Sequence, residues 1–322
     1  MIDEWHIPIG ITARNEAKNI LTLLASLRES IARASTELPC TFRLYVLLND
    51  NSDHTPELLA AFPDVTVWHT AGGIVEAQRM LVERCGNAAP FLVFSDADIL
   101  VDRDALLEIS RVMLACPEVE VAYAEKYPIP PLRRTPLAKA LYLYNLREGY
   151  QTTRHYFNGQ FFALRRWQIP KPEELRWDPR LDTPFFHLAA GIRVDDTYLS
   201  REVLSRAGPG AIRCLPAGIR YRPPETLRGM FRKYQRMRLE LERLSCYFPH
   251  TENAHQQWGR RRTDAVKLRG APFSERIYYG LFQAALWLCK AAYYAQKLYF
   301  THLSARPCPT WSPVVESKER MP

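Results

Sequence analysis

Through the N-terminal third of the chain, short apolar runs alternate with stretches in which apolar residues recur every three or four positions. Short apolar runs bounded by polar residues predict strands at 5–12, 42–48, 65–69 and 91–94. Apolar residues three and four apart predict a helix beginning near Ile20 and another over 74–84, while Thr55 and Pro56 suit an N-cap and a first helical position. Strands and helices in this alternation predict βαβ units, and therefore an α/β fold with a mostly parallel sheet flanked by helices.

A polar cluster follows each of these four predicted strands. The clusters are Arg14 to Glu16, Asn49 to Asp53, Gly72 to Arg79, and Asp96 with Asp98. Because ligands bind outside the carboxyl ends of strands in such sheets, we expect the four clusters to converge on one cleft. Each cluster alone has an ordinary explanation as a loop or turn; the Asp-Ala-Asp sequence, for instance, could begin a turn, with Asp102 or Asp104 capping the next helix. Their shared position after consecutive strands favours a functional site.

The two acids Asp96 and Asp98 follow an apolar run, Phe-Leu-Val-Phe, directly. Removing a carboxylate from water is costly unless a positive charge or hydrogen bonds compensate it. The pattern therefore raises the question of which positive charge or hydrogen bonds compensate the two acids at the end of this strand.

Composition limits the classes of partner. The 322 residues, 47% hydrophobic and 24% charged, suffice for one large domain with an appendage. The net charge of +8 is spread along the chain, and its densest run, 259–262, lacks an aromatic RNA-binding motif, so no nucleic acid partner is predicted. An anionic ligand or a membrane surface is the better match to this charge.

The cysteines and the N-terminus indicate the compartment. Seven cysteines are scattered without a Cys-X-X-Cys pair, which argues against a zinc site or a disulfide framework and favours a reducing compartment. The N-terminus lacks the basic region and apolar core of a secretory signal, so a cytoplasmic protein is expected.

Six segments resemble, in order and spacing, the motifs of glycosyltransferase family 2 on a GT-A fold. They are ITARNEAKNI, VLLNDNSDHT, AGGIVEAQRM, FSDADILVDRDAL, FNGQFFALRR and VDDTYLSREV. The resemblance implies a GT-A nucleotide-sugar-binding and catalytic domain over 1–215, followed by a helical extension with an irregular tail over 216–322. It further implies an inverting enzyme that moves a sugar from a nucleotide diphosphate sugar, most often a UDP-sugar, to an acceptor hydroxyl.

The family resemblance assigns roles to the acids. Asp98 would bind Mn²⁺ or Mg²⁺ bridging the donor diphosphate, and Asp96 would face the ribose or the water shell of the metal. Asp195 and Asp196 match the family's second acidic pair, and Asp196 would be the general base that deprotonates the acceptor. Without the upstream motifs, this pair would read simply as acids favoured at a helix N-terminus.

The same resemblance suggests donor contacts. Glu16 and Asn49 match positions near the base and ribose, and Arg14 or Arg79 could approach the phosphates. Asn49 stands where an acid is more common, which weakens the usual preference for uridine, although an amide can still bind a base edge. Asn158 and Gly159 would shape the sugar and acceptor side.

A further segment resembles a motif of processive family members. Gln235 to Leu239 matches Gln-X-X-Arg-Trp except that leucine replaces the tryptophan, and Arg238 could reach the diphosphate, unless it belongs to a solvent-exposed basic face. The missing aromatic favours transfer of single sugars. The acceptor, whether glycan, lipid or small molecule, does not follow from the sequence.

The segment 277–300 is long enough to cross a bilayer, but Lys290 and Lys297 would be expensive at depth. Together with Arg276 and Gln283 they form a narrow polar stripe with a spacing of seven. Packing on the protein or in an oligomer, an anchor at a membrane interface, and a true span all remain open.

Two other function classes compete with sugar transfer. Nucleotidyl transfer uses a similar sheet but more naturally carries a glycine-rich loop after the first strand, which TARNEAKNI lacks. A non-catalytic nucleotide-sugar binder or membrane-surface partner protein is the other, and the presence of both Asp98 and Asp196 argues against it.

Overall fold

A computed structural model describes residues 5–146, 155–175, 178–186, 195–259 and 263–304, together with positions 306, 308, 318, 319 and 321. The strands in this part of the chain are β1 (Trp5–Ala13), β2 (Cys40–Asn49), β3 (Val65–Thr70), β4 (Leu92–Asp96), β5 (Ile99–Val101), β6 (Val121–Pro128), β7 (Phe161–Leu164) and β8 (Ile212–Tyr221). The α-helices are α1 (Ile20–Glu37), α2 (Thr55–Leu59), α3 (Ile74–Cys85), α4 (Ala105–Ala115), α5 (Pro136–Leu146), α6 (Asp195–Ala207), α7 (Leu227–Tyr247), α8 (Glu252–Ala254), α9 (Ala265–Arg269) and α10 (Phe273–His302).

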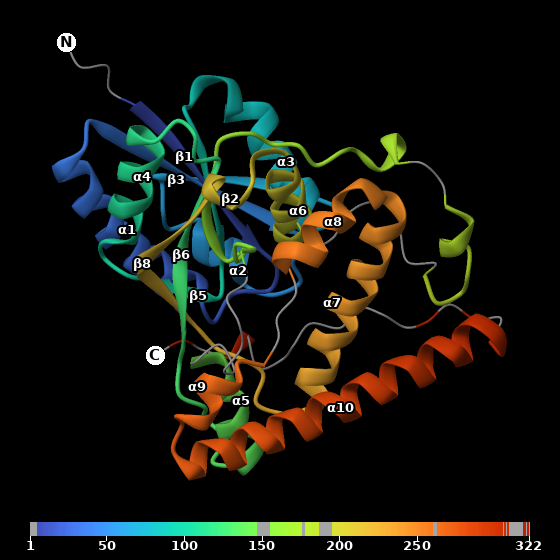
Figure 1. Ribbon diagram of the computed structural model, residues 1–322. Helices are drawn as coiled ribbons and strands as arrows, with labels where there is room; N and C mark the ends of the chain where they lie inside the picture. The colour runs from blue at the N-terminus through green and yellow to red at the C-terminus, as the bar shows by residue number, and fades with distance from the viewer. Residues whose placement is uncertain are drawn as a thin grey trace.

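The strands form one curled sheet in the order β3-β2-β1-β4-β7-β6-β8-β5 (Figure 1). The first four strands of this order are parallel, and β6 runs parallel to β8. Strand β7 is antiparallel to both of its neighbours, and β5 is antiparallel to β8. The predicted α/β fold is confirmed, with a sheet that is mixed beyond β4.

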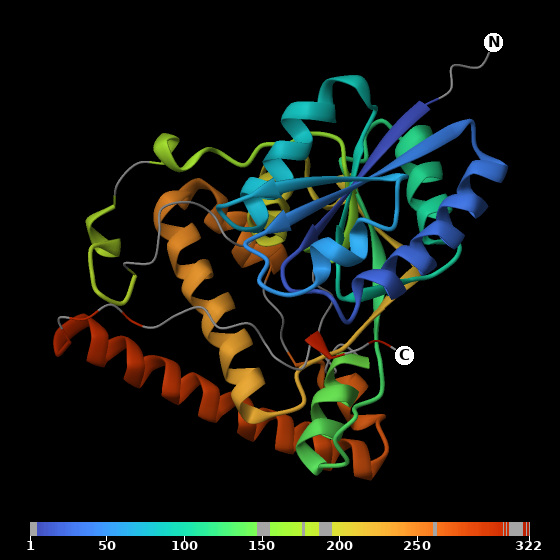
Figure 2. The ribbon, with the colours of Figure 1, turned by 180° about the vertical axis from the view of Figure 1, so that it is seen from behind.

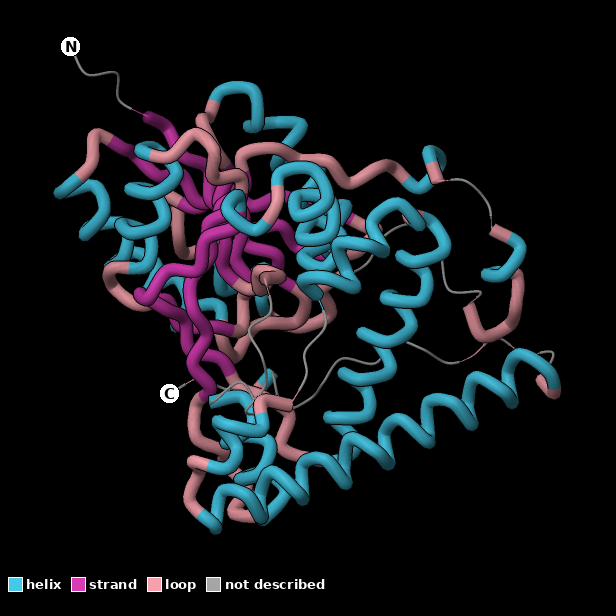
Figure 3. Tube along the Cα trace, viewed as in Figure 1, coloured by secondary structure: helices cyan, strands magenta, loops and turns pink. Residues whose placement is uncertain are grey.

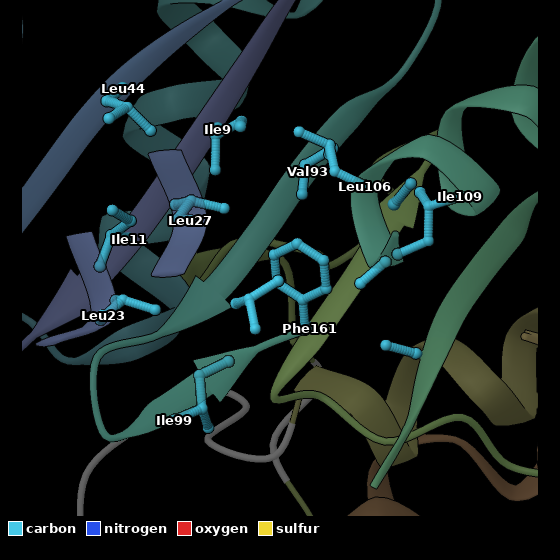
Figure 4. Packing of buried hydrophobic residues seen from close by; sticks show 14 of the residues in the cluster. Ile9, Ile11, Leu23, Leu27, Leu44, Val93, Ile99, Leu106, Ile109 and Phe161 are labelled. Atoms are coloured by element: carbon cyan, nitrogen blue, oxygen red, sulfur yellow. The ribbon is translucent and has the colours of Figure 1, made fainter. Parts of the chain in front are cut away.

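Helices cover both faces of the sheet (Figures 1 and 2). On one face, Ile9 and Ile11 of β1 pack with Leu23 and Leu27 of α1 in a core that α4 completes (Figure 4). On the other face, β1 presents Gly10, where an added Cβ would lie 2.5 Å from Leu81 Cδ2 of α3. Glycine at this position therefore lets α3 approach the sheet closely.

Helices α5, α7, α9 and α10 lie together beside the sheet, with α10 along the outer side (Figures 1 and 3). Helix α10 packs on α5 through stacked Tyr144 and Phe282 rings, 3.6 Å apart, and on α7 through a Gln235 to Gln296 hydrogen bond of 2.7 Å. None of the helices in the described segments combines the length and the apolar content needed to cross a bilayer.

Three details differ from the sequence expectations: the end of β4, the partners of Asp102 and Asp104, and the extent of the sheet. Strand β4 ends at Asp96 itself, so this acid is the last residue of a buried strand. Asp104 occupies the N-cap of α4, but its carboxylate accepts a 3.0 Å hydrogen bond from Arg33 Nε and none from the helix backbone. Asp102 accepts instead from the backbone N–H of Gly218 in β8, at 3.3 Å. The sheet also continues past residue 215, because β8 ends at Tyr221.

Candidate functional site

The four parallel strands end at a common edge of the sheet. In the strand register, Thr12 of β1 lies opposite Asp96 of β4, and Asn49 of β2 lies opposite Thr70 of β3. The loops that follow these strands are therefore neighbours, as their sequence positions predicted.

Hydrogen bonds tie the loop after β1 to the loop after β2. Asn51 Oδ1 accepts from the Asn15 backbone N–H at 2.6 Å, and Thr55 Oγ1 accepts from the Glu16 backbone N–H at 2.9 Å. Asn15 and Asp50 have φ of 57° and 47°, a left-handed conformation that these residue types tolerate. Several polar groups of the second cluster thus hold the loops in place.

The C-terminal tail reaches the same loops. Lys318 forms an ion pair with the buried Glu16, and the Met321 backbone N–H donates to Asn19 Oδ1 at 3.0 Å. Burial and the nearby charge of Arg14 lower the pKa of Lys318 to about 8. Glu16 and Arg14 therefore share their end of the site with a tail that the sequence suggested was merely irregular.

Asn49 and Arg79 are buried and hold backbone groups. Asn49 Oδ1 accepts from the Gly73 backbone N–H at 3.2 Å. The Arg79 guanidinium donates to the carbonyl oxygens of Ile169 and Pro170, at 3.2 and 3.1 Å. In this structure, both side chains position the loops around the site.

Asp96 is the electrostatic centre of the site. Burial raises its pKa well above the ordinary value, and the charges of Asp98, Asp195 and Asp196 raise it further, while Arg236 opposes them. Two acidic pairs nearly 100 residues apart in the sequence, on β4 and at the start of α6, are thus within electrostatic reach of each other.

The second acidic pair opens α6. Asp195 is buried and accepts a 2.7 Å hydrogen bond from Gln78 Nε2 of α3, while burial and the charge of Asp196 raise its pKa to about 7. Asp196 is oriented differently, since its Oδ2 accepts from the Gly159 backbone N–H at 3.2 Å and its Oδ1 accepts from Thr197 Oγ1 at 3.2 Å. The first acid is fixed in the interior and the second is held by the loop before β7.

That loop connects both acidic pairs. Asn158 Nδ2 donates to the Ala124 carbonyl at 2.8 Å and its Oδ1 accepts from the Gln160 backbone N–H at 3.2 Å. The Gln160 carbonyl in turn accepts from the Asp96 backbone N–H at 2.8 Å. The segment 158–160 thereby holds Asp96 and Asp196 in fixed positions relative to each other.

Replacing Gly159 by alanine is expected to lower turnover by about tenfold, because misplacing a catalytic group by a fraction of an ångström is costly. The added Cβ would lie 3.0 Å from Asp196 Cβ and 3.3 Å from its Cγ, so the acid must shift. Gly210→Ala is the matched control, since a Cβ there meets nothing within 4 Å. Steady-state kinetics on both variants test this, and equal rates would contradict the proposed role of the Gly159 contact.

Replacing Asp195 by asparagine is expected to make the stability of the protein less dependent on pH. Because the folded pKa of about 7 exceeds the unfolded value, the folded state holds the extra proton between these values, and stability falls as pH rises through this window. Asparagine cannot ionise, so the variant should match the parent at about pH 4, the unfolded value, and exceed its Tm by several degrees at pH 8, without added metal. Thermal unfolding at both pH values tests this against Asp182→Asn, at an exposed aspartate; an unchanged pH dependence in Asp195→Asn would contradict it.

The structure brings Arg236 of α7 into reach of Asp96 and turns Arg238 to the other side of the helix. Arg238 Nε lies 3.1 Å from Glu242 Oε1, and its Nη2 donates to the Tyr294 hydroxyl of α10 at 3.3 Å. Residues two apart on a helix point about 200° apart, so both arginines cannot face the acids. The sequence motif drew attention to Arg238, and only the rotation of α7 identifies Arg236.

The acid cluster has the charge and donor type that a divalent cation prefers. Oxygen ligands suit Mg²⁺ and Mn²⁺, and Mg²⁺ typically uses one or two carboxylates beside substrate phosphates. Burial and the charges of the neighbouring acids raise the pKa of Asp96, so a cation bound here would offset the repulsion among these acids. Among the described residues, no three His, Cys, Asp or Glu side chains form a complete ligand set. The residues fit a cation that also depends on ligands from a bound diphosphate.

Comparison with known proteins agrees with this geometry. The model of the family named glycosyl transferase family 2 matches residues 9–180. No curated protein matches the chain. A mannosyltransferase from Pyrobaculum calidifontis, in complex with GDP-Man and Mn²⁺, has 15% identity and a TM-score of 0.50 over 92% of this chain and 85% of its own. At such identity the likeness establishes the GT-A fold.

Two further solved structures are similar over somewhat less of the chain. Mannosyl-3-phosphoglycerate synthase from Rubrobacter xylanophilus has 18% identity and a TM-score of 0.47, over 79% of this chain and 77% of its own. Glucosyl-3-phosphoglycerate synthase from Mycobacterium tuberculosis, in complex with phosphoglyceric acid, has 18% identity and a TM-score of 0.45, over 75% and 80%.

Proposed function

Because the chain belongs to glycosyltransferase family 2, we propose that it transfers a single sugar from a nucleoside diphosphate sugar to an acceptor hydroxyl, with inversion and with the help of a divalent cation. The observation that carries this proposal is the convergence of Asp96 and Asp98 with Asp195 and Asp196 at the carboxyl edge of the sheet. A binding protein without activity has no need for the second acidic pair beside the first.

The two pairs take different tasks. Asp98, with Asp96, would hold Mn²⁺ or Mg²⁺, which when bound neutralises charge on the departing nucleoside diphosphate. Asp196 would take the proton of the acceptor hydroxyl as that oxygen attacks the anomeric carbon, and its contact with Gly159 sets its direction. Buried Asp195, with Gln78, would hold the start of α6 in place.

The donor would lie along the loops after β1 and β2. Glu16 would lie beside the nucleoside, and Asn49 would support the loop after β3 through Gly73. Arg14, which follows β1, and Arg236 of α7 would supply positive charge near the diphosphate. A UDP-sugar is the expected donor by family resemblance. We place the enzyme in the cytoplasm.

A thermal-shift panel of UDP, GDP, dTDP and CDP, each with and without Mn²⁺, tests the donor site. A ligand at about 100 times its dissociation constant stabilises the folded state by roughly 2.7 kcal/mol, which shifts Tm measurably. One nucleotide is expected to stabilise the protein only with Mn²⁺. If no nucleotide shifts Tm under either condition, the proposed donor site is contradicted.

A further inference from the structure

The outer face of α10 carries a continuous row of exposed apolar side chains. Phe273, Trp287, Leu288 and Leu298 expose 72%, 71%, 60% and 60% of their surface. Between them the same face presents only smaller or similar apolar residues, namely Ile277, Gly280, Ala284, Ala291, Ala295 and Tyr299. Soluble proteins seldom leave large apolar side chains aligned in this way unless a partner covers them.

The row runs the length of the helix. At 100° per residue these positions fall within about 60° of one line, and thirty residues at 1.5 Å rise extend roughly 45 Å. In a usual amphipathic helix the side that faces away from the protein is polar, whereas in α10 this side is apolar.

The inner face of α10 is fully engaged with the protein. Besides the stacked Tyr144 and Phe282, Lys297 Nζ lies 2.6 Å from Glu242 Oε2 of α7, and buried Tyr293 packs with Leu239. Within the segment that resembles the processive motif, Gln235, Arg238 and Leu239 thus contact α10. The helix is therefore a fixed element, and its exposed row is a permanent surface feature.

Basic residues border the apolar row. Exposed Arg276 and Lys290 lie along one edge, and Glu275 is the sole acid of α10. At the N-terminal end, the short helix α9 adds exposed Lys267 and Arg269. The preceding basic run over 260–262 lies outside the described residues. Apolar and aromatic side chains flanked by lysine and arginine suit the boundary between anionic headgroups and acyl chains.

We propose that the outer face of α10, from Phe273 to Leu298, docks the protein on the surface of an anionic bilayer with the helix parallel to the membrane plane. A second copy of the chain is a poorer occupant, because its own α10 would bring a second set of basic residues and no acids on that face. Anionic headgroups supply the missing negative charge.

Docking in this orientation would hold the candidate site close to the membrane. Helix α7 packs directly on α10, and its Arg236 reaches Asp96. Helices α7 and α10 therefore lie between the acid cluster and the docking face.

Vesicle co-sedimentation of the full chain tests the proposal. The probes are vesicles of phosphatidylcholine alone and of phosphatidylcholine mixed with phosphatidylglycerol. The parent should bind the mixed vesicles, more weakly at high salt, and the double variant Trp287→Glu with Leu298→Glu should bind at least about tenfold more weakly. Leu21→Glu is the matched control, at a leucine of α1 that is 40% exposed.

Sedimentation velocity of the same proteins distinguishes the alternative partner. The proposal predicts the same oligomeric state for the parent and the double variant, and circular dichroism should confirm that both are folded. The inference is overturned if the parent does not bind the mixed vesicles, or if Leu21→Glu loses as much binding as the double variant. It is also overturned if the parent is a dimer and the double variant is a monomer.

Discussion

Asp98→Asn is expected to abolish the dependence of nucleoside diphosphate binding on Mn²⁺. The neutral amide keeps the size of the side chain but removes the charge that attracts a hard cation, and Asp195 and Asp196 are held by other contacts. Titration calorimetry of the stabilising nucleotide, with and without Mn²⁺, measures the ratio of the two affinities. This ratio should be large in the parent and close to one in the variant.

The control for this experiment is Asp182→Asn, which removes one exposed carboxylate that belongs to neither acidic pair. It should retain the parent's response to Mn²⁺. If Asp98→Asn responds to Mn²⁺ as strongly as this control, Asp98 does not hold the cation and the assignment fails.

Asp196→Asn is expected to reduce turnover by about 10² to 10⁴, the usual contribution of a positioned general base, with little change in donor affinity. Asparagine can still accept the Gly159 hydrogen bond through its amide oxygen and donate its amide N–H to Thr197 Oγ1, but it cannot take a proton. Initial rates of transfer and the dissociation constant of the donor, measured on the same preparation, separate the two effects.

The two readouts also distinguish catalysis from mere binding. An enzyme loses turnover and keeps its donor, whereas a protein that only binds nucleotide sugars shows no turnover in the parent. A variant that loses donor affinity and turnover in equal measure would place Asp196 in donor binding and contradict its role as base.

The fold of the N-terminal third, where strands and helices alternate, could be predicted well, because apolar periodicity and helix caps are local features of the sequence. Strands β1 to β4 and helix α3 lie within one or two residues of their expected bounds, α1 begins at the expected residue, and the four strands are parallel as predicted. Strand β5 had no predicted counterpart. The antiparallel insertion of β7 between β4 and β6 was not foreseen, since it depends on pairing between distant segments.

The site was predictable where residues act through their position at strand ends, and unpredictable where they act through distant neighbours. Asp96 and Asp98 stood out because they interrupt a buried strand. By contrast, Gln78 and Asp195 are 117 residues apart, and the tail meets the first loop across some 300 residues. No local pattern encodes such contacts.

Helix α10 shows a further limit. Its polar stripe of Arg276, Gln283, Lys290 and Lys297 was visible in the sequence, but not the direction in which the stripe faces. The structure places Lys297 against Glu242 and leaves Trp287 and Leu288 exposed. Periodicity defines faces on a helix, and only tertiary packing decides which face is covered.

The most direct test of sugar transfer is the rate at which nucleoside diphosphate is released from a panel of nucleotide sugars, with Mn²⁺ and with a chelator. Water can serve as the acceptor hydroxyl in this assay, so the natural acceptor is not required. We expect the parent to release nucleoside diphosphate from at least one donor when Mn²⁺ is present. This release should be lost when a chelator is added to the parent, and it should also be lost in Asp98→Asn and in Asp196→Asn. Release that continues unchanged in both variants, or a parent that binds a donor with Mn²⁺ and never cleaves it, would contradict the assignment of these acids to glycosyl transfer.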